Sequence, residues 1–356
     1  MALTSLSNAS YIPVLGLRPA EMQALDELPE RDKDQLLPLI QLGPWVGAHN
    51  FASSLAKLEE SFGNRPVFVT LCDREQSIGD RSVHREIAAL RSPDRGYDEW
   101  CLFLEQQPNF IPAIQIESIT NLAAQISRLY SLGRGLIIPF EQRSFAGIDS
   151  ISRAVSAQTN GGANVCFFLD FGRADKDLIF SQAKAKAAIA GILENAPNSR
   201  VSISASSFPE SFTAVTKQEI FERSLHMLLK ADFGTKLIYS DRGSARAERQ
   251  TGGGGTPAPR IDYALDQEWK FFRSDDSTDR YAAYAEQAKA AIDDPNWDKN
   301  LRVWGTQMIE RTALGDRSAI VSPKRSTAAR INIHLHRQLH YGRPSDLYET
   351  DDDWLD

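Results

Sequence analysis

Residues 164–170 read NVCFFLD, and the rest of the chain can be interpreted from this stretch. Five apolar or cysteine residues stand between Asn164 and Asp170 with no polar alternation, a pattern typical of a short strand that is buried on both faces. Seven other apolar runs of strand length share this character: 11–17, 36–42, 65–71, 110–116, 135–141, 200–206 and 236–241. We therefore predict eight buried strands.

The spacing of these runs predicts how the strands are connected. Successive runs begin 25 to 45 residues apart, which is the repeat of a strand–helix unit. Helical patterns fill the gaps, as where Ile119, Leu122, Ile126 and Leu129 form one apolar stripe. Alternating strands and helices indicate an α/β protein with parallel pairing, and eight units favour a closed (β/α)₈ TIM-like barrel over residues 1–245. An open doubly wound sheet is the alternative, although no GxGxxG or GxxxxGK[ST] motif follows the first run.

Prolines within the apolar runs affect where the predicted strands can begin, because proline has no N–H to donate to the hydrogen-bond ladder of a sheet. They occur in five of the runs, at Pro13, Pro38, Pro66, Pro112 and Pro139. We expect the true strands to begin at or just after these residues, with the boundary near Pro139 the least well defined.

The chain changes character after residue 245. Residues 246–260 contain TGGGGTPAP and predict a glycine-rich connector. Residues 261–345 are expected to form a C-terminal segment that packs on the barrel, with strand-like pieces at 261–264 and 269–272 and a helix at 280–292. Residues 346–356 make an acidic tail.

Composition narrows the class of protein. The 356 residues carry 40 basic and 47 acidic side chains, a net charge of −7, which argues against coating nucleic acid through bulk positive charge. No apolar run is long enough to span a membrane. The three cysteines, Cys72, Cys101 and Cys166, lack CxxC spacing, so we expect neither a disulfide framework nor a zinc knuckle. With no secretion-type start, a cytoplasmic protein is expected.

Candidate site residues follow the predicted strands, because sites of such barrels are built on the carboxyl-terminal rim. The candidate ligand-binding residues share this position: Arg18, Glu21, Asp73, Glu141, Arg143, Asp170, Ser207, Asp241 and Arg242. Asp170 is the strongest of them, since a charge at the end of so apolar a run needs a partner. Strand ends are also polar for purely structural reasons, so the positions alone assign no catalytic residue.

Two further features suggest ligands. His336 and His340 in HLHRQLH would share one helix face, whereas His334 lies about 200° from His336, and no carboxylate stands between them. We therefore expect a solvated or interface helix here rather than a metal site. Gly252–Gly255 follows the last predicted strand among several arginines, where a phosphate could bind, but four consecutive glycines fit a plain connector better.

Several short motifs resemble the phage-type beta protein family. They run in order along the chain: YIPVL from Tyr11 with Arg18 and Glu21, LPLI from Leu37, LDFG from Leu169, SSFP from Ser206, SDRG from Ser240, RIDY from Arg260 with Trp269, and INIHLH from Ile331. The family occurs in tailed phages and in bacterial genomes, often in mobile or defence-rich surroundings. The resemblance implies a barrel-like domain and a phage–host setting, and it implies no enzyme class.

Three hypotheses follow. In the first, the rim binds a small molecule or a protein partner during phage–host conflict, without proven catalysis. In the second, the rim acids hold Mg²⁺ or Mn²⁺ in a hydrolase of a phosphodiester or nucleotide. In the third, the protein is a non-catalytic interaction module whose contacts lie beyond residue 245.

Overall fold

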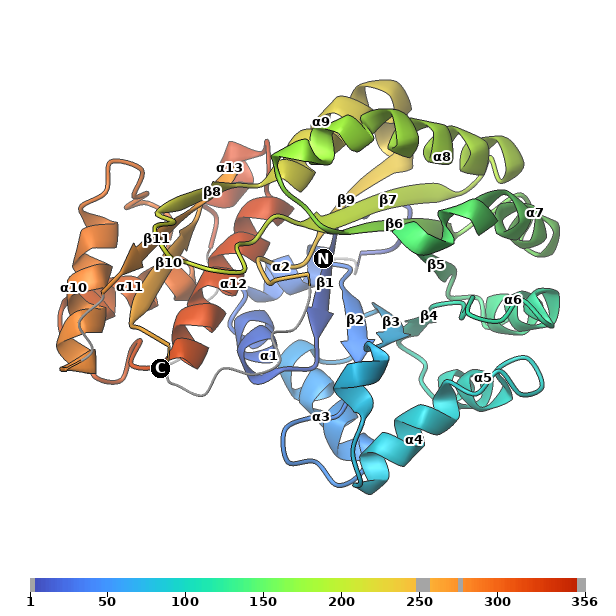
Figure 1. Cartoon of the computed structure of the whole chain (residues 1–356), viewed down its shortest axis with the longest axis horizontal. Helices are drawn as coiled ribbons and strands as arrows, with labels where there is room; N and C mark the ends of the chain where they lie inside the picture. The colour runs from blue at the N-terminus through green and yellow to red at the C-terminus, as the bar shows by residue number, and fades with distance from the viewer. Residues whose placement is uncertain (1–3, 248–256, 275–277, 351–356) are drawn as a thin grey trace.

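Eight parallel strands form a nearly closed barrel, as the apolar runs predict. The computed structural model describes residues 4–247, 257–274 and 278–350 (Figure 1). The barrel strands are β1 (Tyr11–Gly16), β2 (Leu39–Leu42), β3 (Val67–Leu71), β4 (Phe110–Pro112), β5 (Leu136–Glu141), β6 (Val165–Arg173), β7 (Arg200–Ser206) and β9 (Leu237–Asp241). They are ordered β4-β3-β2-β1-β9-β7-β6-β5. A single bridge joins the two ends, where the Ile114 amide donates to the Ile137 carbonyl at 3.0 Å. The α/β barrel prediction is confirmed.

Helices on the outside connect these strands (Figure 1). They are α1 (Pro19–Asp26), α2 (Glu30–Gln35), α3 (Phe51–Phe62), α4 (Ser82–Leu90), α5 (Asp98–Glu105), α6 (Leu122–Tyr130), α7 (Ile148–Gln158), α8 (Gln182–Asn195) and α9 (Phe221–Phe233). Three residues of the predicted stripe, Leu122, Ile126 and Leu129, are buried on α6, whereas Ile119 lies before the helix and is 64% exposed, so its place in the stripe is wrong.

The prolines divide into two groups. Pro38 and Pro66 directly precede β2 and β3, as expected, whereas β4 begins at Phe110 and ends at Pro112, so the boundary expected there is wrong. Pro13 and Pro139 lie within β1 and β5, so the expected boundaries there are also wrong. Pro13 falls where β1 changes partner, since residues 11–13 pair with β9 and residues 14–16 with β2. Pro139 lies two residues beyond the single bridge to β4, so its missing N–H removes little from a short ladder.

Alternation along the strands separates two apolar cores. The inner one fills the barrel with side chains from successive strands, including Ile12, Val14, Phe68, Ile137 and Phe168, and the N-terminal residues Leu6 and Ala9 join it. The outer one lies between the strands and the helices and takes the alternate residues, such as Leu15, Ile40, Phe167, Ile203 and Tyr239. The period of two therefore decides whether a strand residue faces the lumen or the helices.

A second unit follows β9. Strands β10 (Arg260–Ala264) and β11 (Glu268–Arg273) pair antiparallel, and β8 (Lys217–Glu219), from the loop before α9, adds a third strand to their sheet. The helices are α10 (Arg280–Ile292), α11 (Trp304–Ala313), α12 (Pro323–Leu339) and α13 (Pro344–Leu347). The strands expected at 261–264 and 269–272 and the helix at 280–292 are confirmed.

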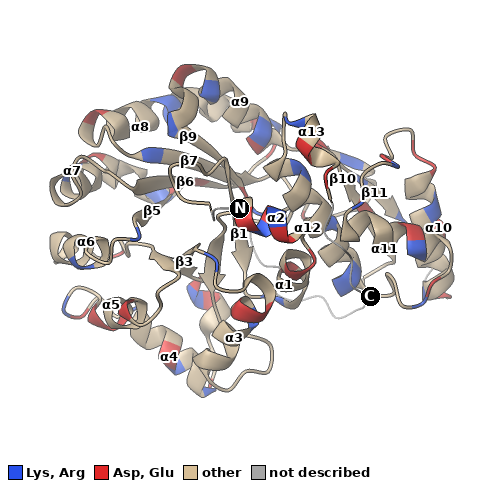
Figure 2. Cartoon of the chain, turned by 180° about the vertical axis from the view of Figure 1, so that it is seen from behind, with Lys and Arg blue, Asp and Glu red and all other residues tan. Residues whose placement is uncertain are grey.

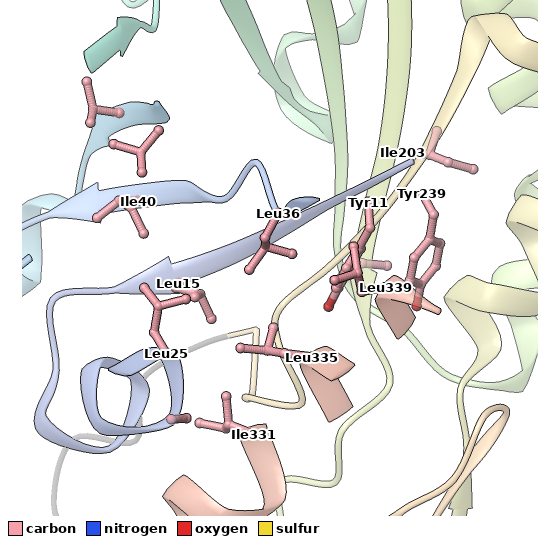
Figure 3. Close-up of a cluster of buried hydrophobic side chains, with 14 of the residues drawn as sticks. Tyr11, Leu15, Leu25, Leu36, Ile40, Ile203, Tyr239, Ile331, Leu335 and Leu339 are labelled. Atoms are coloured by element: carbon pink, nitrogen blue, oxygen red, sulfur yellow. The ribbon is translucent and has the colours of Figure 1, made fainter. Parts of the chain in front are cut away.

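Helix α12 occupies the place of the eighth barrel helix. It packs against α1 on one side, and on the other its Gln338 accepts a hydrogen bond from Arg223 of α9 at 2.9 Å. Figure 3 shows Ile331, Leu335 and Leu339 of α12 in one cluster with the barrel residues Tyr11 and Tyr239. The ring of helices is thus completed by residues that follow an insertion of two strands and two helices.

Candidate functional site

A polar depression lies at the carboxyl-terminal mouth of the barrel. Its lining comes from β1, β2 and α1 and from the segments that follow β1, β3 and β9: Val14, Arg18, Glu21, Gln41, Asp73, Gln76, Arg242, Ala245, Arg246 and Ala247. Arg18, Glu21, Asp73 and Arg242 are among the residues that the sequence predicts for the rim. The structure therefore brings these four candidates together.

Arg18 is folded back over the end of β1. A Cβ atom built on Gly16 would lie 3.3 Å from Arg18 Nε, so the glycine leaves room for the guanidinium. Arg18 donates to Gln76 Oε1 at 2.8 Å, and its Nε lies 3.9 Å from Glu21 Oε2. These contacts hold a cationic group beside the depression while about 38% of its side chain stays exposed.

Glu21 is the buried acid of the depression. It lies in the first turn of α1, and its Oε1 accepts a hydrogen bond from the Gly16 amide at 3.2 Å. Burial raises the pKa of Glu21, although the nearby Arg18 and the Gly16 amide act in the opposite direction. Burial thus favours the neutral acid at this position.

Asp170 and Arg242 form an ion pair across the mouth. Asp170 Oδ2 accepts a hydrogen bond from Arg242, and Oδ1 accepts one from the Gly172 amide at 2.9 Å. The predicted partner of this charge is therefore an arginine. The Arg242 Nε atom is buried and has no hydrogen-bond partner among the described residues.

Asp170 has polar neighbours on both adjacent strands. In the strand register it stands beside Glu141 on β5 and Ser204 on β7. The Ser204 hydroxyl is buried and, within the part of the chain that the structure describes, has no partner. Glu141 is exposed and pairs with Arg143 at 2.8 Å, and neither of these two residues lines the depression.

Asp241 and Ser207 lie outside the barrel mouth. Asp241 continues the outward series of Leu237 and Tyr239, and its carboxylate contacts Tyr11 Oη at 2.7 Å and His334 Nε2 at 2.8 Å. Ser207 donates to Glu222 of α9 in the outer layer. Asp73, Glu141, Asp170 and Asp241 consequently do not surround one pocket, because alternation along β9 turns Asp241 toward α12.

The arginines and glycines predicted to follow the last barrel strand can be compared with the structure only in part. Arg246, one of the arginines near the glycine run, lines the depression and donates to the Pro209 carbonyl at 3.0 Å. Gly252–Gly255 lies outside the described residues. Gln41 and Gln76, which also line the depression, were missed by the sequence analysis, although Gln41 sits at a lumen-facing position of a predicted strand.

The histidine-rich helix is buried within the chain. His334, His336 and His340 have almost no exposed surface, so the solvated alternative is wrong, and the helix packs against α1, α11 and β10. The carboxylate that the local sequence lacks comes from Asp32 on α2, which contacts both His336 and His340.

The remaining surface carries a second depression and charges of both signs. This second depression lies on the outside of the barrel between α7 and α8, and its lining includes Phe145, Asp149, Lys184 and Gly191. Figure 2 shows charged residues of both signs spread over the helices, while the barrel strands carry few. Among the described helices, none has the length and apolar character needed to cross a membrane.

The mouth depression therefore combines guanidinium groups with amide and carboxyl groups. Arginine presents several donors in a planar fork that matches phosphate and carboxylate oxygens. Within residues 4–247, 257–274 and 278–350, the one group of three side chains close enough to share a metal ion is Asp32, His336 and His340, away from the mouth. The geometry of the mouth accordingly favours binding of an anion.

Comparisons with known proteins agree with the sequence motifs. The family model described as Beta protein matches residues 11–340. Protein beta of Enterobacteria phage P4 is 28% identical over 344 residues, which cover 93% of this chain and 93% of that protein. The matched region includes the barrel, the insertion and α12.

Proposed function

Because this chain belongs to the Beta protein family, we propose that its barrel mouth binds a small anionic ligand in a phage–host setting. The phage P4 relative supports the setting, and the mouth depression supports the chemistry. We also propose that the protein works in the cytoplasm, in keeping with its three cysteines, which are free and buried.

One observation carries the proposal: Arg18 and Arg242 line the same depression. They follow two adjacent strands, β1 and β9, so the pairing of these strands fixes their separation. Guanidinium groups that converge in this way bind phosphate or carboxylate through charge-assisted hydrogen bonds. The amides of Gln41 and Gln76 supply neutral donors at the same place.

The acidic side chains of the depression are compatible with an anion. Burial raises the pKa of Glu21, which weakens repulsion by favouring its neutral form. Asp73 is exposed and accepts a hydrogen bond from Gln76 at 2.7 Å, so solvent screens its charge. Asp170 balances the single positive charge of Arg242, but the unpartnered Nε of Arg242 still offers a hydrogen-bond donor.

A second candidate function is metal-dependent hydrolysis of a phosphodiester or nucleotide. The observation that favours it is the strand register, which sets Glu141 beside Asp170. Carboxylates from adjacent strands are the oxygen ligands that Mg²⁺ and Mn²⁺ prefer. In this scheme Arg143 and Arg242 would exchange their carboxylate partners for the substrate phosphate. Calorimetric titration with Mg²⁺ and Mn²⁺ tests it, and heats equal to those of an E141Q/D170N variant would reject it.

Anion binding is tested by isothermal titration calorimetry with inorganic phosphate, pyrophosphate, ATP and citrate. We expect Arg18→Ala and Arg242→Ala each to weaken binding of the best probe at least about tenfold, as the loss of a charge-assisted bond implies. Arg153→Ala is the matched control, because Arg153 is exposed on α7. Absence of binding by the unmodified protein, or equal affinity in all three variants, would reject the proposal.

A further inference from the structure

A buried group of one carboxylate and two imidazoles lies away from the barrel mouth. Asp32 comes from α2, His336 lies in the last turn of α12, and His340 is the residue that follows α12. Asp32 and His336 have side chains with 0% exposure, as does His340. The ligand atoms of all three lie within 4.8 Å of one another.

Each of the two imidazoles contacts a different oxygen of the Asp32 carboxylate. His336 Nδ1 lies 2.6 Å from Asp32 Oδ2, and His340 Nε2 lies 2.8 Å from Asp32 Oδ1. The spacing of four residues places both rings on one helix face, with their centroids 4.7 Å apart. One nitrogen therefore faces each carboxylate oxygen, and the four atoms form a compact donor set.

The backbone of α13 orients the first of these rings. His336 Nε2 lies 2.9 Å from the Leu347 carbonyl oxygen, which can only accept, so Nε2 carries the proton. In a neutral imidazole the lone pair is then on Nδ1, the atom that faces Asp32. A metal-ligating histidine typically donates its other N–H to a backbone carbonyl in this way.

Two lone-pair donors that face each other in a dry interior need a proton or a metal ion between them. We propose that Asp32, His336 and His340 together bind one divalent transition-metal ion, with Zn²⁺ as the preferred ion. Two imidazole nitrogens and two carboxylate oxygens supply four donors, of the types that zinc takes. Zinc–ligand bonds of about 2.0–2.2 Å require the present nitrogen–oxygen contacts to widen by only a fraction of an ångström.

The charges around the group are compatible with such an ion. Arg31 Nε lies 3.9 Å from Asp32 Oδ1, and the Arg31 guanidinium is balanced by Glu349 at 3.0 Å. Arg31 also donates to the Asp346 carbonyl at 3.0 Å. A bound ion would join α2 to the end of α12 and, through Leu347, to α13, and so would stabilise the folded chain by mass action.

This site is independent of the proposed anion binding, because no residue lines both. The test is titration of the full-length, chelator-treated protein with Zn²⁺ alone, followed by calorimetry and by the thermal unfolding midpoint. We expect one ion per chain and a raised midpoint. His336→Gln and His340→Gln should each lower zinc affinity by about tenfold or more, whereas His49→Gln, at an exposed loop position, should leave it unchanged.

Cobalt gives a readout that does not depend on the variants folding. Co²⁺ bound to the unmodified protein should show the visible absorption of a four-coordinate nitrogen and oxygen site, and Zn²⁺ should displace it. A protein that takes up no stoichiometric ion, or one whose uptake is unchanged in folded His336→Gln, would overturn the proposal.

Discussion

His334 Nε2 lies 2.8 Å from Asp241 Oδ2, and this contact joins the last barrel strand to the helix that completes the ring. Both side chains are fully buried, and Asp241 also accepts hydrogen bonds from Tyr11 Oη at 2.7 Å and the Gly243 amide at 2.8 Å. Burial alone would raise the pKa of Asp241, but His334 and these hydrogen bonds hold it below its ordinary value. The pair is part of the framework between β9 and α12.

Replacement of Asp241 should therefore destabilise the protein. Asp241→Asn leaves His334 and Tyr11 with weaker buried partners, and loss of one member of such a pair costs roughly 3–5 kcal/mol. Urea unfolding monitored by circular dichroism measures this change. Asp73→Asn serves as the control, because an exposed substitution should change stability by less than about 0.5 kcal/mol. Equal midpoints for the two variants would contradict the framework role.

Glu222 should make stability depend on pH. Burial raises the pKa of Glu222 to about 8, although hydrogen bonds from Ser207 oppose the shift. The unfolded chain releases this proton near pH 4.5, so the folded state binds more protons between about 4.5 and about 8 and loses stability as the pH rises through that range. The slope from one such group is at most about 1.4 kcal/mol per pH unit.

Glu222→Gln should flatten this dependence and stabilise the protein at neutral and alkaline pH. Urea unfolding at several pH values between about 5 and about 8 provides the measurement. Glu75→Gln, at an exposed position after β3, should retain the slope of the unmodified protein. A Glu222→Gln variant with that same slope would show that Glu222 is ionised in the folded chain.

Gly16→Ala should separate ligand binding from stability. The new Cβ would meet Arg18 Nε at 3.3 Å and displace the guanidinium from its place beside the depression. The backbone of Gly16 lies outside the left-handed region, so alanine adds no backbone strain and unfolding should change by less than about 1 kcal/mol. We expect weaker binding of the best anion probe by calorimetry.

The matched glycine substitution is Gly147→Ala, whose Cβ would make an ordinary 3.5 Å contact with Ile151 far from Arg18. Its anion affinity should equal that of the unmodified protein. Tight binding retained in Gly16→Ala would indicate that the position of Arg18 does not govern affinity.

Leu335→Ala should reveal how strongly α12 contributes to the barrel. Leu335 is fully buried in the cluster with Tyr11 and Leu15, and truncation of such a leucine costs about 2–5 kcal/mol. Leu314→Ala is the control, since Leu314 is 87% exposed and should change stability little. The free energies come from urea unfolding, and a small loss at Leu335 would mean that α12 packs independently of the barrel.

Most of the barrel could be predicted because its strands are buried on both faces. In runs such as VCFFL in β6 and LIIPF in β5, the continuous apolar composition indicates a buried strand without any knowledge of its neighbours. The short strand β8 could not be predicted in this way, because its residues Lys217, Gln218 and Glu219 are polar and pair with a strand some 50 residues later. Its existence depends on tertiary contact alone.

Only those parts of the candidate site that depend on local sequence could be predicted. Strand ends locate Arg18 and Arg242 at the mouth, since parallel strands end at one rim. The direction of Asp241 depends on alternation with Tyr239, which a list of strand ends does not include. The contact between Asp32 and His336 joins residues 304 positions apart, and no local spacing in either segment indicates it.

The late position of α12 has a consequence for biosynthesis. A ribosome delivers all eight barrel strands by residue 241, yet the helix that covers the outer faces of Tyr11, Leu15 and Tyr239 runs only from Pro323 to Leu339. The apolar flank of the newly made strands therefore stays uncovered until α12 has been synthesised. We therefore expect chaperones to bind mainly to nascent chains in which β9 has been synthesised and α12 has not yet emerged from the ribosome.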